Sequence, residues 1–144
     1  MYRRSMLINA KKEFIDITEK LNQHIKLSGI KNGMIYLHTM HTTFGLKIIE
    51  NELLSLCDID DFLNKYIPFN SEYKHNKIKL RQVPLNERLN GASHIRMLFF
   101  NTDLALPIKN GKLLLGKWQK VFAIEMDCDQ KKVRLREIII TITK

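Results

Sequence analysis

The sequence predicts an α+β fold in which antiparallel strands dominate and about three helices accompany them. Segments rich in β-branched and aromatic residues recur along the chain, as is typical of strands. Two Asn-Gly pairs, at 32–33 and 110–111, mark tight turns, and helical spacing of apolar residues is confined to three segments. The 144 residues, of which 44% are hydrophobic and 27% charged, have the size and composition of one globular domain. We therefore expect a single domain over residues 1–144, built mostly as an antiparallel β-sheet sandwich.

The first third of the chain predicts strands and one helix. Residues 2–9 and 13–15 resemble strand material, and Thr18 can cap a helix that runs to about Leu27. Gly29 lies where this helix should stop. The turn at 32–33 then leads into an apolar strand at 34–37.

The middle third predicts a second strand, two helices and a long loop. Residues 46–49 form another apolar run, and residues 53–66 show helical spacing that ends before Pro68. Residues 69–91 carry little hydrophobic period, and a loop of this length is usually functional or disordered. A short helix is predicted from about Ala92 to Phe100.

The last third is rich in strands. A strand at 104–108 reaches the Asn-Gly pair at 110–111, which is a hairpin signal. Residues 112–115, 121–126 and 133–142 supply further strand patterns.

The net charge of +9 is compatible with steering an anionic ligand to the surface. The basic residues are scattered, with short clusters at 11–12 and 131–132, and no aromatic-interleaved basic stripe accompanies them, so nucleic acid is an unlikely partner.

No apolar run is long enough for a membrane span and no signal peptide is recognisable, so we expect a cytoplasmic protein with no membrane partner. Cys57 and Cys128 lie far apart and are interpreted as reduced thiols.

A polar segment at 38–43 interrupts the two central strands. It offers His38, His41 and three threonines, with Glu50 and Glu52 shortly after it. Imidazoles, hydroxyls and carboxylates together suit a metal ion or an anionic group. The alternative is that the threonines satisfy a turn and the histidines are ordinary polar residues. His38 is left out of the candidate site because odd spacing on a strand sends it to the face opposite His41.

A second candidate feature is the start of the helix predicted at 92–100. Its first turn would present free backbone N–H groups, with His94 near that end and Arg96 close by. A helix N-terminus favours anions, so a phosphate is a reasonable ligand there.

Seven short motifs, taken together and in order, resemble the YjbQ family of proteins described as secondary thiamine-phosphate synthases. They are His41-Thr42-Thr43, Glu50-Asn51-Glu52, the Asp-containing helix at 53–66, Tyr73-Lys74-His75-Asn76, Asn90-Gly91-Ala92-Ser93-His94, Leu113-Leu114-Leu115-Gly116-Lys117-Trp118-Gln119, and Glu125 with Asp127. The resemblance covers nearly the whole chain.

The resemblance implies an α+β fold with a large antiparallel sheet, commonly assembled as a homotrimer. It also implies a pocket lined by the three motif histidines, which are His41, His75 and His94, near a subunit boundary. The chain departs from the family pattern in having Phe44 and Gly45 after His-Thr-Thr, and Lys117 before Trp-Gln.

We expect His41, His75 and His94 to be the catalytic residues and to bind a divalent metal, zinc or magnesium. Three histidines suit an open zinc site, whereas magnesium prefers oxygen ligands and would arrive on the substrate. The alternative is that the imidazoles bind phosphate directly or act as acid and base. The remaining expected contacts to substrate or phosphate come from Thr42, Thr43, Ser93, Arg96 and Gln119.

Two functions are compatible with these features. The first is a thiamine-phosphate synthase-like condensation of hydroxymethylpyrimidine diphosphate with thiazole phosphate, as a main or a secondary activity. The second is a homotrimer that binds a metal or a phosphorylated metabolite without catalysis. The chain is too short for a TIM barrel, so it would perform the first function on a different scaffold.

Overall fold

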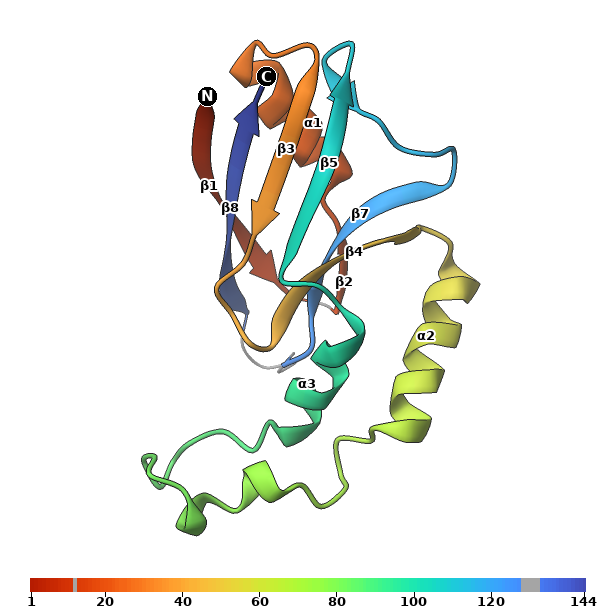
Figure 1. Ribbon diagram of the computed structural model, residues 1–144. Helices are drawn as coiled ribbons and strands as arrows, with labels where there is room; N and C mark the ends of the chain where they lie inside the picture. Colours follow the sequence, from red (N-terminus) through yellow and green to blue (C-terminus); the bar gives the residue numbers. More distant parts are fainter. Residues whose placement is uncertain (12, 128–132) are drawn as a thin grey trace.

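The structure, a computed structural model, describes residues 1–11, 13–127 and 133–144. In these residues eight strands form two sheets, and every strand pairing is antiparallel. The five-stranded sheet has the order β1-β8-β3-β5-β6 and the three-stranded sheet the order β2-β7-β4 (Figure 1). The strands are β1 (Tyr2–Ala10), β2 (Phe14–Asp16), β3 (Gly33–His38), β4 (Phe44–Glu50), β5 (Asp103–Lys109), β6 (Lys112–Leu113), β7 (Gln119–Glu125) and β8 (Arg134–Thr143).

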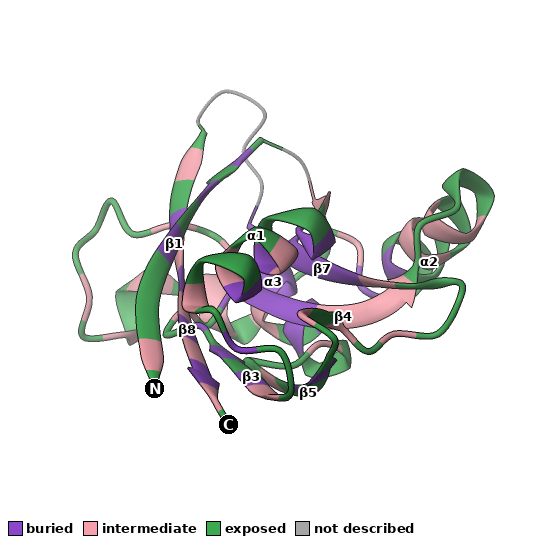
Figure 2. Ribbon diagram, turned by 90° about the horizontal axis from the view of Figure 1, so that it is seen from above, coloured by how far each residue is buried: buried purple, intermediate pink, exposed green. Residues whose placement is uncertain are grey.

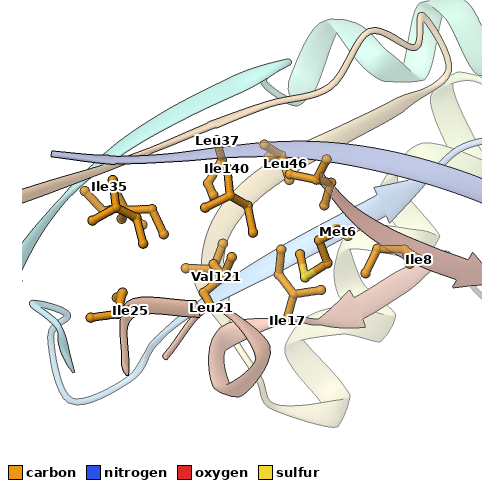
Figure 3. Close-up of a cluster of buried hydrophobic side chains, with 14 of the residues drawn as sticks. Met6, Ile8, Ile17, Leu21, Ile25, Ile35, Leu37, Leu46, Val121 and Ile140 are labelled. Atoms are coloured by element: carbon orange, nitrogen blue, oxygen red, sulfur yellow. The ribbon is translucent and has the colours of Figure 1, made fainter. Parts of the chain in front are cut away.

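The main hydrophobic core lies against the inner face of the five-stranded sheet. Strand alternation directs Met6, Ile8 and Ile140 into this core, while their sequence neighbours face solvent. The three-stranded sheet contributes Leu46 and Val121, and helix α1 (Thr18–Ser28) adds its apolar stripe. Figure 3 shows these side chains interdigitating between β8, β7 and α1.

Strand β7 is buried on both faces. Its Val121 and Ala123 belong to the main core, whereas Phe122 and Ile124 face a second, smaller core. Helices α2 (Leu53–Tyr66) and α3 (Gly91–Arg96) cover that second face with Leu63 and Ala92. In Figure 2, β7 is purple through most of its length while α2 is largely green, because α2 buries only a narrow stripe.

The antiparallel α+β sandwich predicted from the sequence is confirmed. Helix α1 ends at Gly29, whose φ of 70° is left-handed. The hairpin at 110–111 joins β5 to β6 with positive φ at both residues, as a type I′ turn requires. The basic clusters named above extend to Lys12, Lys131 and Lys132, which lie outside the described residues, as does Cys128.

Two details of the helices differ from the sequence prediction. The Thr18 hydroxyl does not cap α1 but accepts a hydrogen bond from the Val121 amide at 2.9 Å, and Asp16 accepts one from the Thr18 amide at 2.9 Å. The helix predicted over 92–100 is a six-residue α-helix, followed by a 3₁₀ turn (Met97–Phe99), a common way for a helix end to tighten.

The long segment between α2 and α3 contains two single 3₁₀ turns, η1 (Lys74–Asn76) and η2 (Ile78–Leu80). It extends below the sandwich in Figure 1 and returns to α3. This path brings His75 of the loop next to His94 of α3.

Candidate functional site

The centre of the candidate site is a pair of imidazoles, His75 from η1 and His94 from α3. Their ring centroids lie 4.5 Å apart with an interplanar angle of 58°. The Asn76 side chain holds the two segments together, since its Oδ1 accepts a hydrogen bond from the Gly91 amide at 2.9 Å. Gly91 permits this approach, because a Cβ added there would lie 2.5 Å from Tyr73 Cβ.

His41 lies just before β4 and contacts the start of β8. Arg136 Nη1 approaches its Nδ1 at 3.4 Å, and the Glu137 amide approaches its Nε2 at 3.3 Å. A neutral imidazole has only one acceptor nitrogen, so only one of these contacts is a hydrogen bond in either tautomer. His41 is thus engaged with β8.

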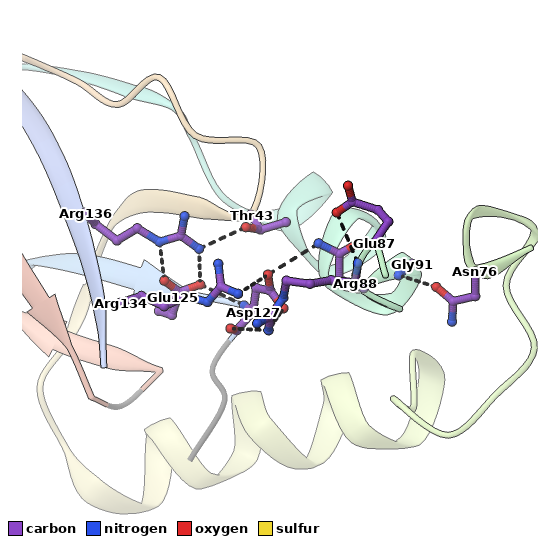
Figure 4. A network of polar contacts seen from close by, with 10 residues as sticks. Thr43, Asn76, Glu87, Arg88, Gly91, Glu125, Asp127, Arg134 and Arg136 are labelled. Atoms are coloured by element: carbon purple, nitrogen blue, oxygen red, sulfur yellow. Dashed lines mark hydrogen bonds and ion pairs between the residues drawn. The ribbon is translucent and has the colours of Figure 1, made fainter. Parts of the chain in front are cut away.

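A buried ion pair lies beside His41. Arg136 pairs with Glu125, which is fully buried, through both Nε and Nη2, the latter 2.9 Å from Oε1 (Figure 4). Arg136 Nη2 also donates to the Thr43 hydroxyl at 3.1 Å. Charged partners in low dielectric need such complete hydrogen bonding to remain buried.

Asp127 organises the polar residues nearer the imidazole pair. Its own amide donates to Glu125 Oε1 at 2.8 Å, so the two acids are linked. Its carboxylate accepts hydrogen bonds from Arg88 Nη2 at 2.7 Å and Asn90 Nδ2 at 3.3 Å, and pairs with Arg134 Nη2 at 3.4 Å. Figure 4 shows Arg88 and Arg134 reaching Asp127 from two different segments.

Burial favours the neutral form of two of the histidines, His94 and His41. Burial lowers the pKa of His94 below its ordinary value, His75 and Arg81 lower it further, and Asp127 opposes the shift. Burial likewise lowers the pKa of His41, with Arg136 adding to the effect. Neutral imidazoles are competent as bases and as single hydrogen-bond donors.

The residues expected to hold phosphate are spread more widely. Thr43 is buried against Arg136, and Thr42 is exposed beside it. Ser93 is buried in α3, and the Gly91 amide of the same short helix is taken by Asn76.

Arg96 lies in the interior, where Nε donates to the Ile67 carbonyl at 3.0 Å and Nη2 to Asn64 at 2.7 Å. Its guanidinium stacks 3.8 Å from the Phe69 ring centroid. These contacts join α3 to the end of α2.

Gln119 lies at the opposite end of β7 from Glu125, and its side chain accepts a hydrogen bond from the Gly116 amide.

The expected three-histidine metal site is not assembled within one chain. His75 and His94 adjoin each other, but His41 is engaged with β8. Over residues 1–11, 13–127 and 133–144, no three His, Cys, Asp or Glu side chains are arranged to hold a metal ion. Two adjacent imidazoles are one protein ligand short of the three that the expected open zinc site requires.

Sequence reasoning assigned no role to Arg88, Arg134 or Arg136. Arg134 and Arg136 alternate with Leu135 at the start of β8, and Arg136 continues the inward face of Ile138 and Ile140. An arginine on the buried face of an otherwise apolar strand is a signal for a buried acid, and it was available in the sequence.

Two open grooves, each of about 370 Å³, lie away from the histidines. One runs between α1 and the β5–β6 hairpin, and the other lies over Ile59 and Phe62 of α2. The imidazole and guanidinium chemistry, not the size of these grooves, identifies the candidate site.

Comparison with known proteins assigns the family. A family model described as UPF0047 protein YjbQ-like matches residues 4–144. The chain belongs to the YjbQ-like UPF0047 family. A UPF0047 protein of Methanothermobacter thermautotrophicus is 34% identical over 115 residues, covering 80% of this chain and 74% of the relative. One from Archaeoglobus fulgidus is 30% identical, covering 80% and 82%.

Solved structures of YjbQ-like proteins have the same fold. A Sulfolobus solfataricus protein, described as YbjQ-like and of unknown function, superposes with a TM-score of 0.80 at 26% identity, covering 98% of this chain and 95% of that one. A Clostridium acetobutylicum protein of the yjbq/upf0047 family gives 0.77 at 28% identity, covering 99% and 100%. In the described part of this YjbQ-like chain, no helix is long and apolar enough to cross a bilayer.

Proposed function

We propose that the site around His75 and His94 binds a phosphorylated small molecule and catalyses a thiamine-phosphate synthase-like condensation. The single observation that supports this is the imidazole pair, His75 and His94, within range of the charges of Asp127 and Arg81, where Asp127 in turn holds Arg88 and Arg134. The resemblance to the YjbQ family supplies the reactants, hydroxymethylpyrimidine diphosphate and thiazole phosphate.

In the proposed reaction the protein would position the two reactants and stabilise the negative charge on the leaving diphosphate. The thiazole nitrogen forms a bond to the pyrimidine methylene carbon, and the bond from that carbon to the diphosphate oxygen breaks with its electron pair. Guanidinium groups and imidazole N–H groups would stabilise the charge on the leaving diphosphate. Holding both reactants in line would supply most of the remaining acceleration.

A divalent metal, zinc or magnesium, stays a prediction at His41, His75 and His94. A third ligand would have to come from a second copy of the chain or from the bound diphosphate. Elemental analysis of purified protein tests this, with one metal per chain as the expected result and metal-free protein as the contrary one.

The activity is tested by supplying both substrates and magnesium and measuring thiamine phosphate. The wild-type chain should form product and His94→Ala should not. His38→Ala is the matched control, because His38 is exposed at the end of β3 and faces away from the site. Product formation no greater than that of His94→Ala would end the proposal.

The second candidate is a non-catalytic homotrimer that holds a metal or a phosphorylated metabolite. The outward-lying aromatic residues of α2, Phe62 and Tyr66, leave apolar surface available for association. Stoichiometric bound ligand without turnover of either substrate would favour this function over the first.

A further inference from the structure

Two arginines from distant segments converge on one buried carboxylate. Arg88 precedes α3, Arg134 begins β8, and their Nη2 atoms lie 2.7 and 3.4 Å from the two oxygens of Asp127. The Asp127 side chain is only 8% exposed, whereas those of Arg88 and Arg134 are 38% and 23% exposed. The carboxylate is thus fixed inside, and the two guanidinium groups lie between it and solvent.

The hydrogen bonding of these guanidinium groups is incomplete. The Nε atoms of both Arg88 and Arg134 are buried and lack a hydrogen-bond partner within the described part of the chain. A buried donor without an acceptor is costly, and the cost is greater for a charged group. One carboxylate also balances only one of the two positive charges.

We propose that Arg88 and Arg134 form an anion subsite that takes a phosphate group of the ligand. Guanidinium groups present planar pairs of N–H donors that match phosphate oxygens, and the exposed parts of both side chains leave such donors accessible to an anion. Asp127 fixes the separation of the two arginines before the ligand arrives. This inference rests on the proposed function, because it places one phosphate of that ligand next to the imidazole pair.

The position of the subsite agrees with the rest of the site. Asn90 also donates to Asp127, and Asn90 immediately precedes the helix that carries His94. A phosphate bound by Arg88 and Arg134 would lie near His94, on whose imidazole the charge of Asp127 acts. A diphosphate or a phosphate monoester fits this requirement better than an uncharged ligand.

The first test is calorimetric titration of inorganic pyrophosphate into the full chain at low salt. Arg88→Gln and Arg134→Gln should each weaken binding at least about tenfold, as expected for the loss of a charge-assisted pair. Arg3→Gln is the matched control, because it removes the same charge from the exposed outer face of β1 and should leave affinity unchanged. Pyrophosphate affinity equal to wild type in both site variants would overturn the subsite.

A second test uses the unaltered protein, so it does not depend on a variant folding. Phenylglyoxal modifies accessible arginines, and peptide mass spectrometry reports each site. Pyrophosphate should protect Arg88 and Arg134 but not Arg3, whereas equal modification with and without pyrophosphate would contradict the proposal. Protection without any thiamine phosphate formation would retain the subsite and reject the proposed activity.

Discussion

At the scale of single residues, Glu125 and Arg136 form a buried ion pair in the site. Both oxygens of Glu125 accept from Arg136, and Oε1 also accepts the Asp127 amide. The pair therefore fixes the end of β7, the start of β8 and, through Thr43, the segment that follows His41. Its removal should affect stability and site geometry together.

Arg136→Met should lower the free energy of unfolding by about 3–5 kcal/mol, because it leaves the Glu125 carboxylate buried without its partner. Adding Glu125→Gln should recover much of this loss, since the unpaired charge is then absent. Denaturant titration of the three proteins measures both effects. A loss below about 1 kcal/mol for Arg136→Met would show that the pair behaves like an exposed one.

The depressed pKa of His94 predicts a pH dependence of stability. Above its ordinary value of 6.5 the residue is neutral in both folded and unfolded chains, so it contributes no slope. Below pH 6.5 the unfolded chain binds the proton first, and stability falls as the pH drops toward the folded-state pKa. In His94→Gln the free energy of unfolding, measured by denaturant titration, should fall less steeply as the pH is lowered below 6.5.

Asn70→Gln provides the comparison for that experiment and should keep the wild-type slope, because it changes an exposed residue that does not titrate. Part of the slope should survive in His94→Gln, because burial also lowers the pKa of His41 and of His24. An unchanged slope in His94→Gln would contradict the assigned shift.

The sequence could identify the histidines but not their arrangement. His75 and His94 were recognisable from their motifs, and their contact depends on a loop with no hydrophobic period. Arg96 was expected near a phosphate because it lies close to the N-terminus of the helix that carries His94. A spacing of two residues on a helix turns its side chain away from His94 toward α2, where Asn64 and Ile67 bind it.

At the scale of elements, η1 and α3 are joined by a contact that only glycine permits. A methyl group at position 91 would lie 2.5 Å from Tyr73 Cβ and 3.0 Å from Asn76 Oδ1. Tyr73 Cβ is tied to the backbone, so the loop itself must move. The position of His75 thus depends on the absence of a side chain at residue 91.

Gly91→Ala should therefore separate η1 from α3 and cost about 1–3 kcal/mol, as overpacking does. The separation of the two imidazoles should reduce pyrophosphate affinity and any turnover. Gly116→Ala is the control, since the added atom would meet only the flexible end of Gln119 at 3.3 Å. Wild-type stability and affinity for Gly91→Ala would exclude this role for the contact.

Most element boundaries follow from local sequence signals. The glycine after α1, the Asn-Gly hairpin and the alternation along β8 each have a local physical cause, and the structure agrees with them. The two-sided burial of β7 was not predictable, because it depends on α2 and α3 packing against a sheet whose other face is also covered.

At the scale of the whole molecule, no described helix or loop covers the outer face of the five-stranded sheet. Leu7, Tyr36 and Leu135 on this face are 57%, 46% and 61% exposed. Exposed apolar residues on three neighbouring strands favour association with another copy of the chain. The homotrimer that the resemblance implies stays a prediction, and this face is the surface that we expect it to use.

Light scattering coupled to size exclusion should accordingly give three times the chain mass of 17.0 kDa. Leu135→Lys, which places a charge on the uncovered face, is a variant that should dissociate the assembly if this face is the contact. Gln23→Lys is the comparison, because it adds the same charge on the exposed side of α1, which packs on the core side of the sheet and not on its outer face. A wild-type mass of one chain would reject the trimer.

Because β7 contributes side chains to both hydrophobic cores, neither core can unfold without disturbing the other. Loss of α2 and α3 would bare Phe122 and Ile124 on the same strand that supports Val121, and loss of the sandwich would remove the strand itself. Calorimetry should thus record a single cooperative transition, with the β7 amides among the slowest to exchange hydrogen. The helices that cover the second core, including the one that carries His94, should therefore unfold at the same temperature as the two sheets.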